Sequence, residues 1–118
     1  MKRKILIVED NVGLSQIQKD WLSRAGYDAV TAMSEPIARS LIRRMQFDLI
    51  LSDVRLPEGD GISLLEWLRK EKKDIPFIIT TEYVSVPDVV RTIKLGARDY
   101  LPKPVHRDYL LELAEDVF

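Results

Sequence analysis

The sequence predicts an α/β fold in which a doubly wound, five-stranded parallel sheet lies between two layers of helices. Two observations predict it. Five short apolar segments alternate with five helical patterns along the 118 residues, and three of these segments contain no polar residue. Such alternation is typical of right-handed β-α-β units, and continuously apolar strands are typical of a sheet covered on both faces. No linker or internal repeat divides the chain, so we expect a single domain over residues 1–118.

Each predicted strand is a short run of apolar and β-branched residues. The expected strands are 5–8, 29–32, 49–51, 77–79 and 100–101. The first, third and fourth are continuously apolar, whereas the second is weaker and the fifth is very short. The three strong segments are therefore the ones that predict burial on both faces of the sheet.

Helical periodicity fills the intervals between the strands. In four of them apolar residues recur at spacings of three and four: Leu14, Ile17, Trp21 and Leu22; Ile37, Ala38, Leu41, Ile42 and Met45; Ile62, Leu64, Leu65 and Leu68; Leu110, Leu111 and Ala114. Ser34 and Ser85 are predicted N-caps, and the third helix is expected to begin near Asp60. Gly26 and Gly96 are expected to end the first and fourth helices. The fifth helix is predicted from about residue 108 to residue 118.

Composition excludes several classes of function for these residues. A formal net charge of −1 gives no large basic surface, so we expect no direct nucleic-acid binding by this domain. Cysteine is absent, which excludes disulfides and thiol catalysis and suits a reducing cytoplasm. The apolar run at 5–8 is too short for a signal peptide, and no segment approaches the ~20 apolar residues of a membrane span. We therefore expect a cytoplasmic protein that does not contact membranes.

Polar residues that can bind ligands or take part in a reaction follow the ends of the predicted strands. They are Glu9 and Asp10 after the first strand, Ser52 and Asp53 after the third, Thr80 and Thr81 after the fourth, and Lys103 beyond the fifth. Taken singly, each has an ordinary explanation, because an acid can be a turn residue or cap, a threonine a common strand residue and a lysine solvated surface. The carboxyl ends of parallel strands lie at one edge of a sheet. Their joint occurrence therefore predicts one site.

The chemistry of this residue set is specific. Three neighbouring carboxylates repel one another unless a cation neutralises them. Oxygen ligands without histidine or cysteine select Mg²⁺, with Mn²⁺ as the alternative, and not zinc. Mg²⁺ usually takes one or two carboxylates and phosphate oxygens, which leaves a carboxylate oxygen free to attack phosphorus. With a lysine and a threonine to hold the transferred oxygens, the set predicts phosphoryl transfer to a carboxylate.

Four segments resemble the signature segments of two-component response regulator receiver domains. They are ILIVED (5–10), LILSDVRLPEGDG (49–61), PFIITTEY (76–83) and GARDYLPKP (96–104). The resemblance covers essentially the whole chain. It implies a flavodoxin-like sheet with strand order 2-1-3-4-5 and five helices. It also implies a signalling domain that receives a phosphoryl group from a sensor histidine kinase.

The resemblance assigns a role to each matching residue. Glu9 and Asp10 match the acidic metal-binding pair, Asp53 the phospho-acceptor, the backbone carbonyl of Arg55 a further metal ligand, Thr81 the switch hydroxyl, Tyr100 the switch aromatic, Lys103 the lysine of the site, and Pro104 the residue that follows a cis peptide bond. Thr81 is preferred to Thr80 because its spacing from Asp53 and Lys103 fits better and its side chain alternates with Thr80 along the strand.

One position departs from the pattern of the family. The residue after the switch threonine is normally small, whereas here it is Glu82. A carboxylate at that position is expected to repel an incoming phosphodonor, narrow its access, or screen the phosphoryl group from water. Phosphorylation, dephosphorylation or both would then be slower. The alternative is that Glu82 points to solvent and has no effect.

Within the family, DVRLP and GARDYLPKP look most like receivers of sigma-54-dependent transcriptional activators of the nitrogen-regulator class. That likeness implies an ATPase and a DNA-binding domain elsewhere in a longer protein, although a stand-alone receiver fits equally. The face made by the fourth helix, fifth strand and fifth helix carries charges of both signs: Arg91, Lys94, Arg98, Asp99, Asp108 and Glu112. A phosphorylation-promoted homodimer through this face is expected, with a solvated surface as the alternative.

Two other classes of function compete with a signalling domain. Phosphohydrolases of the aspartyl-phosphate type need a second acid two residues after the nucleophile, and Arg55 occupies that position, so we expect no turnover enzyme. A pseudo-receiver that only binds proteins would not need the full acid set. His106 is the only histidine and is predicted to be a surface residue, not a ligand.

Overall fold

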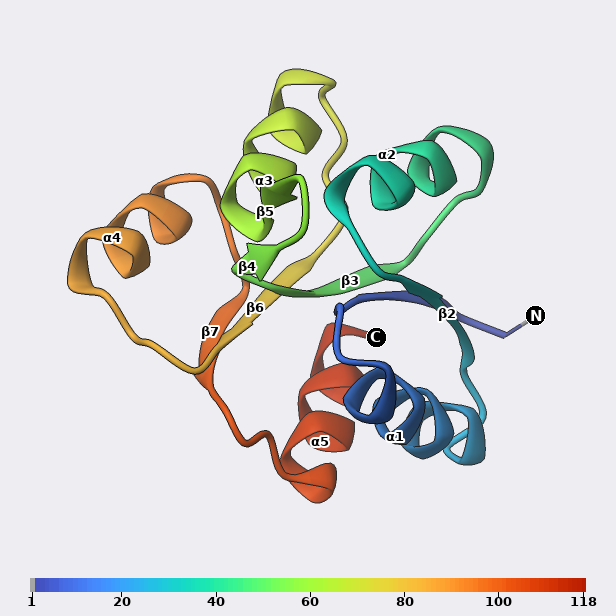
Figure 1. Cartoon of the computed structure of the whole chain (residues 1–118). Helices are drawn as coiled ribbons and strands as arrows, with labels where there is room; N and C mark the ends of the chain where they lie inside the picture. Colours follow the sequence, from blue (N-terminus) through green and yellow to red (C-terminus); the bar gives the residue numbers. More distant parts are fainter. Residues whose placement is uncertain (1) are drawn as a thin grey trace.

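The computed structural model describes residues 2–118 as alternating strands and helices (Figure 1). In chain order the elements are β1 (Lys4–Val8), α1 (Val12–Arg24), β2 (Asp28–Ala32), α2 (Glu35–Arg44), β3 (Leu49–Asp53), β4 (Arg55–Leu56), β5 (Gly59–Asp60), α3 (Gly61–Lys70), β6 (Phe77–Thr81), α4 (Val86–Lys94), β7 (Asp99–Pro102) and α5 (Arg107–Val117). Five predicted strands and five predicted helices are thus present.

The main sheet is parallel, with strand order β2-β1-β3-β6-β7. These strands are the five predicted ones, so the predicted order 2-1-3-4-5 is confirmed. The order reverses between β1 and β3, because the chain first extends the sheet to one side and then to the other. A doubly wound sheet has its crevice at that point, beyond the carboxyl ends of the strands.

Helices cover both faces of this sheet. Figure 1 shows α1 and α5 on one side and α2, α3 and α4 on the other. The central strands supply both cores by alternation, since Leu6 and Ile50 pack in one cluster with the α2–α3 side, and Ile7 and Leu51 pack in the other with the α1–α5 side. This is why residues 5–8 of β1 and 49–51 of β3 are apolar without a break.

The helix starts follow the capping signals in the sequence. The side chains of Ser34, Asp60 and Ser85 accept hydrogen bonds from the backbone N–H groups of Ile37, Ser63 and Asp88, respectively. A cap at each of these positions satisfies N–H groups that the first turn leaves without partners. The predicted starts of α2, α3 and α4 are confirmed.

The buried face of α1 differs from its predicted apolar stripe. Ser15 and Gln18 are buried with Leu22, whereas Ile17 is 50% exposed. Ser15 tolerates burial because its hydroxyl donates to the carbonyl of Val12, at 3.0 Å. The helix is therefore rotated by about one residue from the orientation that hydrophobicity alone predicts. Ile37 of α2, also predicted in the core, is exposed.

A short antiparallel hairpin, β4–β5, is an addition that the sequence reading did not predict. It pairs Arg55 with Asp60 and Leu56 with Gly59, and it lies between the end of β3 and the start of α3. Strands of two residues are too short to produce a periodic signal. The hairpin begins two residues after Asp53, the last residue of β3.

None of the helices within residues 2–118 is long and apolar enough to cross a lipid bilayer.

Candidate functional site

The carboxyl ends of β1, β3 and β7 converge at one edge of the sheet. The Lys103 ammonium donates to Glu9 Oε1 at 2.5 Å and to Asp53 Oδ2 at 2.8 Å, across 94 and 50 residues of sequence. All three side chains are nearly inaccessible to solvent. The prediction that these groups meet, because each follows the carboxyl end of a parallel strand, is therefore correct.

Asp10 completes an acidic cluster at the mouth of the site. One carboxylate oxygen from each of Glu9, Asp10 and Asp53 can be chosen so that all three lie within 4.8 Å of one another. Glu9 and Asp53 are buried and Asp10 is exposed. Three carboxylates and one ammonium leave two uncompensated negative charges, which is the charge that a divalent cation neutralises.

Burial and pairing perturb two of these groups in ways that follow from their contacts. Burial raises the pKa of Glu9 above its ordinary value, although hydrogen bonds from Lys103 and the Asn11 N–H oppose the effect. Burial alone would lower the pKa of Lys103, but its hydrogen bonds to Asp53 and Glu9 outweigh that and raise it. Lys103 therefore remains a cation at neutral pH.

The donor set of this cluster fits a hard divalent cation. Its ligand atoms are carboxylate oxygens, and two of them come from partly desolvated residues that gain from a positive charge. The single histidine of the chain, His106, is exposed at the start of α5, as predicted, and does not belong to the cluster. The residues present thus suit Mg²⁺ or Mn²⁺ and not a metal that needs nitrogen or sulfur ligands.

A small pocket of about 170 Å³ opens beside the acidic cluster. Its lining consists of Asp10, Asp53, Arg55, Thr81, Glu82 and Tyr83. Thr81 lines this pocket and Thr80 does not, which agrees with the alternation argument. The Thr81 hydroxyl donates to the carbonyl of Tyr83 at 3.2 Å and accepts from its N–H at 3.1 Å. Glu82 is exposed and lies at the rim of the pocket.

The profile of the response regulator receiver domain matches residues 5–115. The chain belongs to this family. It is therefore a signalling domain of two-component systems, and the family resemblance drawn from its sequence is confirmed.

Named relatives of this receiver domain are regulatory proteins. It is 35% identical over 112 residues to the response regulator protein PilR of Pseudomonas aeruginosa, covering 95% of this chain and 25% of that protein. It is 40% identical over 114 residues to the transcriptional regulatory protein ZraR of Salmonella typhimurium, covering 97% of this chain and 26% of that protein. The receiver domain thus spans about a quarter of the length of these relatives.

Solved receiver domains share the fold closely. The CheY-like receiver domain protein of Methanospirillum hungatei JF-1 superposes with a TM-score of 0.94 at 31% identity, covering 99% of this chain and 94% of that one. The non-phosphorylated HemR receiver domain of Leptospira biflexa gives 0.91 at 37% identity, covering 98% and 94%. The similarity therefore extends over the whole sheet and its helices.

Tyr100 of the receiver domain is half-buried on β7, and its hydroxyl has no hydrogen-bond partner within residues 2–118. The hydroxyl lies near the backbone of Ser85 without a hydrogen bond of normal geometry. Burial raises the pKa of Tyr100. A buried hydroxyl without a partner costs free energy. The peptide bond between Lys103 and Pro104 is cis, as the resemblance implied.

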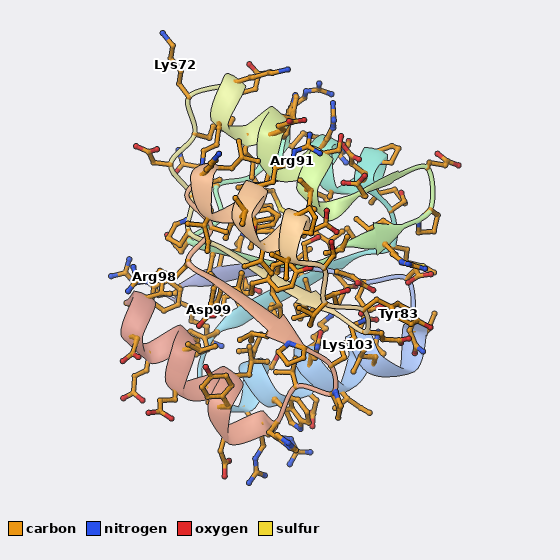
Figure 2. All side chains as sticks on the ribbon, turned by 90° about the vertical axis from the view of Figure 1, so that its left-hand side faces the viewer. Lys72, Tyr83, Arg91, Arg98, Asp99 and Lys103 are labelled. Carbon is orange, nitrogen blue, oxygen red and sulfur yellow. The ribbon has the colours of Figure 1, made fainter. Side chains whose placement is uncertain are left out.

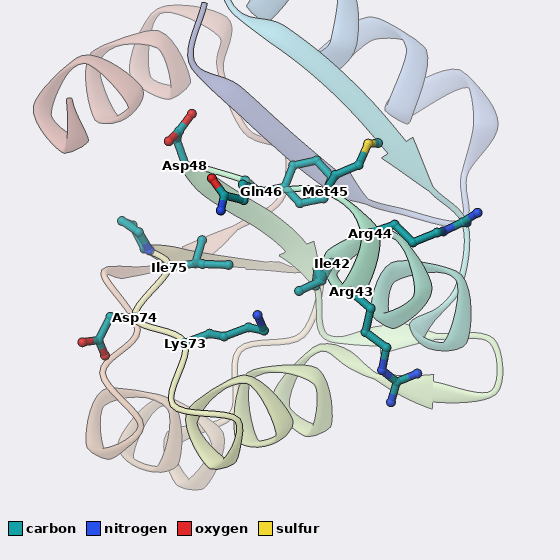
Figure 3. Close-up of a pocket in the computed structure, with 11 residues that line it drawn as sticks. Ile42, Arg43, Arg44, Met45, Gln46, Asp48, Lys73, Asp74 and Ile75 are labelled. Atoms are coloured by element: carbon teal, nitrogen blue, oxygen red, sulfur yellow. The ribbon is translucent and has the colours of Figure 1, made fainter.

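A larger groove of the receiver domain lies at the opposite edge of the sheet (Figure 3). It measures about 620 Å³ and is lined by residues 42–48 and 73–76, which precede β3 and β6. Charges of both signs surround it, and it contains no member of the acidic cluster. The smaller pocket at the carboxyl edge therefore contains the candidate reactive residues, although the groove at the opposite edge is larger.

Tyr83 is a site residue that the sequence reading did not single out. The Arg55 guanidinium lies over its ring, 4.6 Å from the centroid, so the two side chains join the loops after β3 and after β6 beside the pocket. Figure 2 shows Tyr83 and Lys103 on the side of the molecule away from Lys72 and Arg98. A contact between an exposed residue of a two-residue strand and an exposed loop residue has no periodic signal in sequence, so only the fold reveals it.

Proposed function

We propose that the receiver domain accepts a phosphoryl group on Asp53 and switches conformation in response. The observation that carries this proposal is the shared ion pair, in which one buried ammonium, Lys103, bridges Glu9 and Asp53 within the acidic cluster. A carboxylate, a fixed cation and a divalent-cation site are the parts that phosphoryl transfer to an aspartate requires.

Glu9, Asp10, Asp53 and the backbone carbonyl of Arg55 are the proposed ligands of Mg²⁺, or of Mn²⁺. The bound ion would neutralise charge on the oxygens of the transferred group. The hairpin that carries Arg55 begins two residues after Asp53, which supports its inclusion. Asp10 is the exposed member of the set and the one that solvent reaches first.

Each remaining residue has a role that its position supports. An Asp53 carboxylate oxygen attacks the phosphorus of a phosphohistidine, the new oxygen–phosphorus bond forms as the nitrogen–phosphorus bond breaks, and the imidazole leaves. Lys103 already donates to Asp53 and is close enough to pair with a phosphoryl oxygen. Thr81 exchanges its bonds to the Tyr83 backbone for one to the phosphoryl group.

The proposed switch couples Thr81 to Tyr100. When the Thr81 hydroxyl turns toward the phosphoryl group, it vacates space next to β7. Tyr100, whose buried hydroxyl has no partner within the described residues, then turns inward and alters the surface of α4, β7 and α5. Such an element transmits a signal if phosphorylation biases it by ~1–3 kcal/mol.

Glu82 is proposed to modulate access to Asp53. Its exposed carboxylate lies on the rim of a pocket of about 170 Å³ that also contains Asp53. A negative charge there repels an anionic phosphodonor and attacking hydroxide alike. Both phosphorylation and hydrolysis are therefore expected to be slower than without it.

The proposed donor is a sensor histidine kinase, and the proposed output is transcription, in line with the names of the relatives. We assign residues 1–118 to one receiver domain within a sigma-54-dependent activator of the nitrogen-regulator class. Phosphorylation would promote a homodimer through α4, β7 and α5. The domain is proposed to act in the cytoplasm, without contact of its own with DNA or membranes.

A turnover phosphohydrolase is the competing function. Arg55 stands where such an enzyme has its second acid, and a guanidinium does not release its proton as a carboxylic acid does, so it cannot act as a general acid. The test is mass spectrometry after incubation with acetyl phosphate and Mg²⁺, on the wild type and on Asp53→Asn. One labile phosphoryl adduct that the variant lacks supports the proposal. Multiple turnover would favour the hydrolase, and no adduct would favour a pseudo-receiver.

A further inference from the structure

Glu35, the first residue of α2, is a buried carboxylate outside the acidic cluster. It is only 4% exposed. Its Oε1 accepts from the Asp60 N–H at 2.9 Å, and its Oε2 accepts from the Ser63 hydroxyl at 3.2 Å and from Arg39 Nε at 2.8 Å. A buried charge is costly unless it is paired and hydrogen-bonded, and here every contact but that of Arg39 comes from the chain at β5 and α3. Glu35 thus joins α2 to the segment after Asp53.

The segment that Glu35 holds is the β4–β5 hairpin, which has little stability of its own. Each of its strands has two residues, and a hairpin this short is marginal in isolation. Its turn also contains Glu58 in the left-handed region, at φ 57°, which costs free energy for a residue with a side chain. Contacts from elsewhere in the fold must therefore maintain its conformation.

Glu35 packs directly against the hairpin backbone. A Cβ atom on Gly59 would lie 2.1 Å from Glu35 Oε1, so the carboxylate and the backbone are already in contact. The next glycine, Gly61, donates its N–H to the carbonyl of Val54 at 2.7 Å, and a Cβ there would lie 2.2 Å from the Asp53 carbonyl oxygen. The hairpin is thus fixed between Glu35 on one side and the backbone at Asp53 and Val54 on the other.

The link to the cation site runs through one strand pair. Asp60, whose N–H Glu35 accepts, pairs with Arg55, whose carbonyl is a proposed ligand of the divalent cation. We propose that Glu35 is a positioning residue that sets the affinity of the cation site by fixing the Arg55 carbonyl through Asp60. This inference rests on the proposed function. Residues that orient ligands in this way typically change metal affinity by about 10–100-fold when they are altered.

Two substitutions of Glu35 distinguish the effect of side-chain length from the effect of charge. Glu35→Gln keeps an oxygen at the Oε1 position for the Asp60 N–H and loses the charge. Glu35→Asp keeps the charge and shortens the side chain by one methylene, so it no longer reaches Asp60. With Mg²⁺ alone as the ligand in isothermal titration calorimetry, we expect about 10-fold weaker binding for Glu35→Asp and affinity within about twofold of the wild type for Glu35→Gln.

The matched control is Asp20→Asn, which removes another carboxylate that pairs with an arginine four residues later, Arg24, but lies on α1. Its Mg²⁺ affinity should equal that of the wild type. Equal affinity in Glu35→Asp, or a 10-fold loss in Glu35→Gln, would overturn the inference. If Glu35→Asp does not fold, Glu35→Ala takes its place, because it also removes the acceptor of the Asp60 N–H, and the same criterion applies.

The proposed function fails by a different result. If the wild type binds no Mg²⁺, or if Asp53→Asn binds Mg²⁺ and forms the phosphoryl adduct as the wild type does, the site itself is misassigned. If both tests of the site succeed and only the Glu35 series shows no effect, the proposed function stands and the role of Glu35 is excluded.

Discussion

Glu9 is the residue on which the electrostatics of the site depend most. It is buried next to two other carboxylates, and it shares its only side-chain cation partner within the described residues, Lys103, with Asp53. Burial raises its pKa, so the folded protein binds a proton at Glu9 more tightly than the unfolded chain does. Without a divalent cation, the charged form of Glu9 therefore costs stability.

The sign of the resulting pH dependence is fixed. Stability from Glu9 is fully present below its ordinary pKa of 4.5 and is lost as the pH rises through the raised value of the folded state. Glu9→Gln imitates the protonated form. We expect it to raise the unfolding midpoint at pH 7 without Mg²⁺, with a smaller difference at pH 4.5. Thermal unfolding by circular dichroism at both pH values checks this, and a lower midpoint at pH 7 would contradict it.

Glu82 gives a kinetic prediction at the same scale. Replacement by alanine removes a negative charge from the rim of the pocket that contains Asp53. We expect Glu82→Ala to take up phosphoryl from acetyl phosphate, and to lose it, about 3–10 times faster than the wild type, because a like charge that borders the same small pocket is worth about 1 kcal/mol in water. Phosphoprotein gels read over time measure both rates. Glu82→Gln should resemble alanine, and unchanged rates in both variants would leave Glu82 without a role.

At the scale of elements, a single arginine joins two helix ends. Arg69, near the end of α3, donates to the carbonyls of Leu95 and Gly96 at the end of α4 and to those of Lys73 and Ile75 before β6. The last carbonyls of a helix have no partners within the helix. A cation near them also interacts favourably with the negative end of the helix dipole. The carboxyl end of α4 is therefore fixed to α3, whereas its amino end lies next to Tyr100.

We expect Arg69→Ala to lower the free energy of unfolding by about 2 kcal/mol, since it leaves several partly buried carbonyls without a charged donor. Arg91→Ala is the matched control. Its guanidinium pairs with Glu66 across the exposed surface of α3 and α4, so its loss should leave the unfolding midpoint unchanged. Urea unfolding followed by tryptophan fluorescence compares the two. Equal effects would show that the carbonyl contacts of Arg69 contribute nothing.

Elements whose signal repeats along the sequence were the ones it could predict. The apolar runs defined β1, β3 and β6, and the serine caps defined the starts of α2 and α4. The β4–β5 hairpin was not predicted because two-residue strands have no periodicity. The rotation of α1 was not predicted because Ser15 can be buried once its hydroxyl donates to the carbonyl of Val12. Tertiary packing overrides hydrophobicity in the second case.

At the scale of the molecule, the site follows from topology. Parallel strands have their carboxyl ends at one edge, so residues from three distant segments could be assigned to one cluster before their geometry was known: Glu9 and Asp10, Asp53, and Lys103. The contacts made by the hairpin and by α2 could not be predicted in this way. Arg55 on Tyr83 and Glu35 on Asp60 arise from where the hairpin and α2 happen to meet their neighbours.

The outer surface of α4 leads to the last prediction, for the whole molecule. Val86, Val90 and Ile93 form an exposed apolar row along this helix, and Ile93 is 64% exposed. The row borders Arg91 and Lys94, and Tyr100 lies on the adjacent strand β7. If phosphorylation turns Tyr100 inward, the surface next to this row changes shape, and a second copy of the chain can bury it.

Sedimentation velocity should then detect a dimer that acetyl phosphate and Mg²⁺ promote, and Ile93→Asp should abolish it. A charge in a buried apolar contact costs several kcal/mol, which exceeds the ~1–3 kcal/mol available from the switch. Ile17→Asp is the control, because Ile17 is 50% exposed on α1, across the sheet from α4. Dimerisation should persist in that variant. A dimer that forms equally without phosphoryl donor would show that self-association does not depend on the switch. A dimer that persists in Ile93→Asp would show that the apolar row of α4 is not the dimer interface.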